Sequence, residues 1–221
     1  MNVYATLTLA FVLTGDAQVV TNGSEDTHFR FEASQCDGSF HSEWRSREGR
    51  VVAEEELVFK DQLWFRYHLQ RWTIKQDVLA IRENETVRLV IVNGTTTRQV
   101  TLRPEKKTLV GPQLVDYLGA QLQRLRKGAA VEFSYLIPEH ALVLSLRALV
   151  DRSSRPNETV VRVEATSMLM RAFVPKTVLA YDNAGLLKSM TGRLLPQIGD
   201  QKNPVALDGI IRIERIEPGC R

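Results

Sequence analysis

Most of this chain alternates apolar and polar residues with a period of two, and this alternation constrains its fold more than any other feature. In residues 63–70, for example, Phe65 and Tyr67 fall on one face of the expected strand. Successive strand residues point to opposite faces, so this period is typical of half-buried β-structure. Turn signals such as Asn93-Gly94 separate the runs and favour hairpins. The sequence therefore predicts a mainly β protein built as a long antiparallel meander.

One segment near the middle of the chain, residues 111–128, departs from this period. Apolar residues such as Leu118 and Leu122 recur there at three- and four-residue spacing, which is typical of an amphipathic helix. Pro112 suits the start of a helix, and the closing glycine suits its end. We predict one main helix at about residues 112–127 that covers a curved sheet, forming a half-barrel or an open barrel.

The composition is that of an ordinary globular protein of 221 residues, with 43% hydrophobic and 25% charged residues. All-β proteins of this length are commonly single domains. The net charge of +3 is small, and basic residues are interleaved with acidic ones, which disfavours nucleic acid as a partner. No segment approaches the roughly 20 apolar residues of a membrane-spanning helix, so we expect none.

The amino-terminal apolar run, Val3 to Thr14, resembles the core of a secretory signal, and Gly15 and Ala17 supply small residues for cleavage. We predict a signal peptide at residues 1–17 and one β-rich domain at residues 18–221. The protein would then be periplasmic or secreted. The alternative is that the same run forms the first β-strand.

Two cysteines, Cys36 and Cys220, lie near the two ends of the expected domain. In an oxidising compartment they could form a disulfide that ties the carboxyl-terminal tail to the first strands. The alternative is a pair of free thiols, and the sequence leaves both open.

Residues that would indicate catalysis or metal binding do not cluster in this sequence. The histidines are far apart and lack metal-ligand spacing, and no nucleophile elbow or phosphate-binding glycine loop is present. Consecutive residues of Glu54-Glu55-Glu56 point to opposite faces of a strand, which we interpret as a solvated edge. We therefore expect no enzyme, cofactor or metal, with a hydrolase as a third and more distant reading.

Large side chains at two-residue spacing, together with the helix, predict an apolar cavity between sheet and helix. An ordinary filled core is the alternative. The predicted cavity residues are Phe65, Tyr67, Leu118, Leu122, Phe133, Tyr135, Met168 and Met170. At the basic end of the helix, Arg124, Arg126 and Lys127 would meet an anionic head group.

Part of the second half resembles an uncharacterised family of exported bacterial β-rich half-barrel proteins. The resemblance covers residues 131–196 and rests on Phe133 to Pro138, Val174 to Asp182, and the Asp182-Asn183-Ala184-Gly185 turn that leads into Thr191 to Pro196. More loosely, the architecture is similar to that of periplasmic lipoprotein carriers, whose curved sheet shelters acyl chains. Those carriers have more than one helix against the sheet, whereas this sequence shows one.

Two functions follow as hypotheses. The first is an exported binding module that holds a lipid, an acyl chain or another apolar ligand. The second is a non-enzymatic structural or assembly protein of the cell envelope, which would dock another protein through sheet edges or through Trp44, Trp64 and Trp72.

Overall fold

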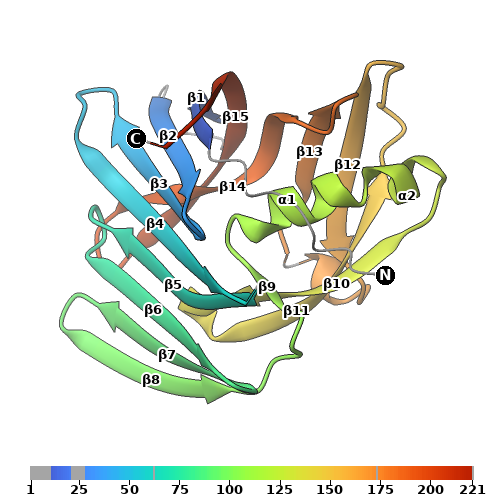
Figure 1. The fold of residues 1–221 in the computed structure, drawn as a ribbon. Coiled ribbons are helices and arrows are strands. Elements are labelled where there is room, and N and C mark those ends of the chain that lie inside the picture. The colour runs from blue at the N-terminus through green and yellow to red at the C-terminus, as the bar shows by residue number, and fades with distance from the viewer. Residues whose placement is uncertain (1–10, 21–27, 62, 173, 221) are drawn as a thin grey trace.

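The computed structural model describes residues 11–20, 28–61, 63–172 and 174–220. Within this part of the chain, the strands form one 15-stranded sheet (Figure 1). The strands are β1 Phe11–Val19, β2 His28–Cys36, β3 Ser39–Ser46, β4 Val51–Lys60, β5 Leu63–Arg71, β6 Gln76–Glu83, β7 Thr86–Asn93, β8 Thr96–Leu102, β9 Leu109–Val110, β10 Val131–Ile137, β11 Leu142–Val150, β12 Glu158–Ala165, β13 Thr177–Asp182, β14 Leu187–Gly199 and β15 Pro204–Pro218. The predicted mainly β fold with a curved, open sheet is confirmed.

The order of the strands brings the first and last of them together. From β1 the meander runs outward to β8, and from β15 it runs back through β14 to β9. β1 pairs antiparallel with both β2 and β15, so it lies in the interior of the sheet. The two edges are β8 and the two-residue β9, which pairs parallel to β10. Among the described strands, backbone hydrogen bonds between β8 and β9 therefore do not close the sheet into a barrel.

Side chains close the gap that the backbone leaves open. Val110 of β9 and Leu136 of β10 share a buried cluster with residues of β4 to β7, among them Leu57 and Trp64. The indole nitrogen of Trp64 donates a hydrogen bond to the Thr108 carbonyl oxygen at 2.8 Å. The β9 end of the sheet therefore packs against β4 to β7, and the sheet curves back on itself (Figure 1).

The predicted helix is present as two helices, α1 Gln113–Ala120 and α2 Leu122–Arg126, separated at Gln121. Their buried leucines pack against β10 to β13, and the Tyr181 hydroxyl donates a hydrogen bond to the Val115 carbonyl oxygen at 2.9 Å. Gly128 follows with a φ of 83°, a left-handed conformation that suits a helix end. Among the described residues, no helix is long and apolar enough to cross a lipid bilayer.

The region of the predicted signal peptide includes part of the sheet. Phe11 to Val19 form β1, and Ala17 is completely buried. Cleavage after Ala17 would remove most of a strand that is paired on both sides. Residues 1–10 lie outside the described part of the chain. Export therefore stays a prediction; residues 11–19 form a strand, and the earlier part of the apolar run lies outside the described residues.

A β-bulge changes the expected face of Phe65. Val58 pairs with Arg66 and Phe59 pairs with Trp64, so Phe65 is the extra residue between them. As a result Trp64 is buried and Phe65 is 41% exposed. The simple alternation that placed Phe65 with Tyr67 on the inner face was wrong at this position, because a bulge shifts the register by one residue.

Candidate ligand cavity

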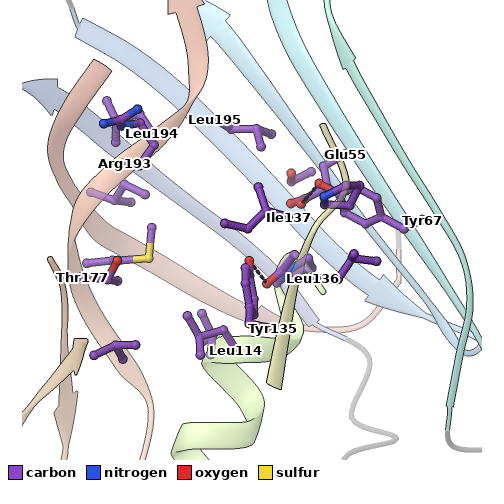
Figure 2. A pocket seen from close by; sticks show the side chains of 18 of the residues that line it. Glu55, Tyr67, Leu114, Tyr135, Leu136, Ile137, Thr177, Arg193, Leu194 and Leu195 are labelled. Carbon is purple, nitrogen blue, oxygen red and sulfur yellow. Dashed lines mark hydrogen bonds between the residues drawn. The ribbon is translucent and has the colours of Figure 1, made fainter. Parts of the chain in front are cut away.

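A cavity of about 520 Å³ lies inside the curved sheet beside the start of α1. Its lining is mostly apolar and comes from both halves of the chain. In Figure 2, Ile137 lies near the centre of the view and Leu114 below it beside the helix, with Glu55 and Tyr67 on the right and Thr177 and Arg193 on the left. The volume falls in the range of small-molecule sites, about 300–1,000 Å³.

The polar end of the cavity is built by β4, β5 and β10. Alternation along β4 turns Glu55 inward and leaves Glu54 and Glu56 on the other face, so Glu55 is only 8% exposed. The Tyr67 hydroxyl donates a hydrogen bond to Glu55 Oε1 at 2.8 Å. The Tyr135 hydroxyl donates to the Gly111 carbonyl oxygen at 3.2 Å (Figure 2).

Gly111 fits this end because it has no side chain. A Cβ atom at this position would lie 2.6 Å from Glu55 Oε1 and 2.6 Å from a ring carbon of Tyr67, and the φ of 52° also favours glycine. The chain can therefore turn from β9 into α1 directly against the carboxyl group of Glu55.

A second polar group beside Glu55 is fully paired. Arg71 is buried, and its Nε donates to the Leu195 carbonyl oxygen at 2.8 Å. One terminal nitrogen contacts Glu139 Oε1 at 2.9 Å, and the other donates to the side-chain oxygen of Gln76. These contacts join β5 to β14 and to the 3₁₀ turn Pro138–His140, so Arg71 stabilises the closed arrangement of the sheet.

The pKa of Glu55 is raised from 4.5 to about 7. Burial is the largest cause, because the charged form loses its hydration. The hydrogen bond from Tyr67 opposes this shift, Glu139 adds to it, and Arg71 opposes it. The same burial, next to Glu55, raises the pKa of Tyr67 well above its usual value. Near neutral pH, Glu55 is thus poised between its acid and carboxylate forms.

Asp116 is a second carboxyl group in the cavity lining, on α1. Asp116 is exposed to solvent, yet the surrounding protein raises the pKa of its carboxyl group to about 6 through loss of hydration. Among the described residues it has no hydrogen-bond or ion-pair partner. Besides Glu139, which is paired with Arg71, the cavity lining therefore includes one buried and one exposed carboxyl group.

We expect the stability gained by Glu55→Gln to grow as the pH rises from 5 to 8. Between pH 4.5 and 7 the folded protein keeps a proton on Glu55 that the unfolded chain releases, so wild-type stability falls as pH rises. Above pH 7 the glutamine variant should be more stable than wild type by about 3 kcal/mol. Urea unfolding at each pH measures this difference. A constant difference across the range would contradict it.

The predicted cavity residues occupy different environments. Tyr67, Tyr135 and Met170 line the cavity. Leu118, Leu122 and Phe133 belong to the core cluster between the helices and β10 to β13. Phe65 is exposed, and Met168 is 83% exposed, so neither lines the cavity. Ligand binding by any of them stays a prediction.

The predicted head-group residues lie at α2, outside the cavity lining. Arg126 donates hydrogen bonds to Thr159 Oγ1 at 2.8 Å and to the Asp182 carbonyl oxygen at 3.1 Å. Arg124 and Lys127 are exposed. These three side chains therefore do not face the space in which an apolar chain would lie.

The acidic groups of the cavity were missed by sequence reasoning. Glu55 was interpreted as part of a solvated edge, yet it is buried. Alternation indicates that it points away from its neighbours Glu54 and Glu56, and its place opposite Tyr67 follows only from the pairing of β4 with β5. A glutamate with apolar residues two positions away, at Ala53 and Leu57, was the available signal.

Cys36 and Cys220 form a disulfide, with Cα atoms 5.6 Å apart. Cys36 ends β2 and Cys220 follows β15. These are the two neighbours of β1 in the sheet. The bond therefore fastens the carboxyl-terminal tail across the amino-terminal strand.

Comparisons with known proteins identify the fold and no more. No protein-family model and no curated protein matches the sequence. The structure is similar to that of a β-barrel-like protein from Brucella abortus, a domain of unknown function (DUF1849). The TM-score is 0.62 at 8% sequence identity, and the match covers 98% of this chain and 100% of that one. The chain therefore has a β-barrel-like fold, in agreement with the β-rich family that it resembles.

Proposed function

We propose that this protein is an exported binding module that holds an apolar ligand, such as a lipid or an acyl chain, inside its curved sheet. The observation that carries the proposal is the cavity of about 520 Å³ beside α1. Folded interiors are normally packed without voids larger than a water molecule. A mostly apolar space of this size with a few convergent polar groups is typical of a ligand site.

The disulfide supports the exported part of this proposal. Disulfides persist in oxidising compartments such as the periplasm and are rare in the bacterial cytosol. The bond between Cys36 and Cys220 suits a periplasmic or secreted protein.

Docking of an envelope protein, the second candidate function, has less support from the tryptophans. Trp44 and Trp64 are buried, with 5% and 2% of their surface exposed, and only Trp72 among the three is exposed, at 51%. The long polar edge strand β8 offers free backbone groups, but its threonines, glutamine and arginine provide little apolar surface. The cavity is therefore the better supported site.

Leu114→Trp should abolish or strongly weaken binding of an apolar probe, because the larger ring would occupy the cavity that Leu114 lines. Displacement of a fluorescent fatty-acid analogue measures the affinity, and native mass spectrometry shows whether a lipid co-purifies. Val205→Trp is the matched control, since Val205 is 47% exposed and lies outside the lining. Equal binding by both variants, or no ligand in wild type by either method, would refute the proposed function.

A further inference from the structure

The acidic and basic groups of the cavity lining differ in whether they already have a partner. This difference bears on the class of ligand that the cavity accepts. Its lining includes the acids Glu55, Asp116 and Glu139, the bases Arg71 and Arg193, and one histidine, His140. All three guanidinium nitrogens of Arg71 already donate hydrogen bonds, and Glu139 is its ion-pair partner. The arginine on β14, Arg193, contacts Asp208 at 2.7 Å. Glu55 and Asp116 form no ion pair with any described residue, although the nearby charge of Arg71 favours the carboxylate form of Glu55.

A buried hydroxyl points to the same end of the cavity. Ser42 lies opposite Glu55 across β3 and β4, lines the cavity and is only 4% exposed. Its Oγ atom makes no well-formed hydrogen bond to any described residue, although it lies near enough to Glu55 to favour the charged carboxylate. A buried hydroxyl without a partner is destabilising, so native proteins usually satisfy such groups, with a ligand as one means.

The carboxyl group of Glu55 can accept further hydrogen bonds. Oε1 accepts the hydrogen bond of Tyr67, and the Ser42 hydroxyl lies close to the carboxyl group without forming a well-aligned hydrogen bond. An ammonium group has three donors and no acceptor, so it can satisfy the carboxylate and the serine oxygen together. A carboxylate or phosphate head offers only acceptors at neutral pH and would bring a like charge toward Glu55 in a poorly hydrated space.

We propose that the cavity selects an amphiphile with one apolar chain and a primary amine head, which Glu55 and Ser42 bind at the inner polar end. The inference rests on the proposed function and adds the head-group class. The apolar lining around Leu114 and Ile137 receives the chain, and the charge-assisted hydrogen bond to Glu55 orients the amine. Asp116, which has no cation partner, adds to the negative potential of the space.

Three probes with the same chain and different heads test the selectivity: dodecylamine, 1-dodecanol and dodecanoate. Isothermal titration calorimetry at pH 7.4 with the full chain, below the aggregation concentration of each probe, measures the affinities. We expect dodecylamine to bind at least about tenfold more tightly than dodecanoate, with 1-dodecanol between them. Equal affinities, or tighter binding of dodecanoate, would overturn the inference and leave the proposed function standing. Binding of none of the three would refute both.

Two variants locate the head group. Glu55→Gln should weaken dodecylamine about tenfold or more and change 1-dodecanol little, because only the charged contact is lost. Glu56→Gln is the matched control: Glu56 is the next residue of β4, points to the other face and pairs with Arg66 at 2.9 Å. Loss of dodecylamine binding in both variants, or in neither, would contradict the assignment.

Ser42→Ala separates binding from folding. Its hydroxyl has no well-formed partner in the ligand-free protein, so the variant should be at least as stable as wild type in thermal unfolding. Dodecylamine affinity should still fall several-fold. Unchanged affinity in a folded Ser42→Ala protein would remove Ser42 from the site.

Discussion

Arg71→Met is expected to lower the free energy of unfolding by about 3 kcal/mol, because it leaves the mostly buried carboxylate of Glu139 without its partner. The Arg71 and Glu139 side chains are 4% and 15% exposed and lie 2.9 Å apart. The substitution also removes the donor to the Leu195 carbonyl oxygen, so it breaks the links from β5 to β14 and to the 3₁₀ turn. Urea unfolding at pH 7 measures the loss.

A surface arginine on the same strand is the matched control. Arg66 pairs with Glu56 at 2.9 Å, and both side chains are more than a third exposed. Exposed ion pairs contribute at most about 1 kcal/mol, so Arg66→Met should have a small effect. The double variant Arg71→Met/Glu139→Gln should recover part of the loss, since no unpaired carboxylate remains. Equal effects of the two single substitutions would show that Arg71 does not hold the sheet closed.

Removal of the disulfide by Cys36→Ser/Cys220→Ser is expected to destabilise the protein by about 5 kcal/mol in the chain-entropy treatment. The bond joins residues 184 positions apart, so it closes a loop that contains nearly the whole chain. Loss of a native disulfide typically costs about 2–5 kcal/mol, which sets the lower end of the expectation. Equilibrium unfolding in urea measures it.

Reduction provides an independent check. Wild type in dithiothreitol should unfold at the same urea concentration as the double serine variant, and the variant itself should not respond to the reductant. If mass spectrometry shows that the bond is broken but the wild-type unfolding midpoint is unchanged, the loop constraint contributes little to stability. Neither reduction nor the double serine substitution should alter probe affinity even a few-fold, because neither cysteine lines the cavity.

The local pattern was sufficient for most of the described strands and for the helical segment, whereas residues 11–17 of β1 were assigned to a signal peptide. Residues 63–70 were predicted as a strand and lie within β5. The helical period at 112–127 corresponds to α1 and α2, with the break at Gln121 unforeseen. Such features depend on neighbours within a few residues, which is why a two- or four-residue period reveals them.

The candidate site was only partly accessible to the same reasoning. Tyr67, Tyr135 and Met170 were named in advance and line the cavity, but the bulge at Phe65 reversed one inner position. A bulge arises from how two strands pair, and the alternation within one strand does not report it.

The sequence by itself determined that this chain folds as an antiparallel meander with one helical segment, because side-chain period is a local property. Only the tertiary structure decided that β1 joins β15, that the sheet ends pack together through Trp64 and Thr108, and that Glu55 and Ser42 face a cavity. These contacts join residues far apart in the chain. They depend on sheet curvature and strand register, and neither can be inferred from any single segment of the sequence.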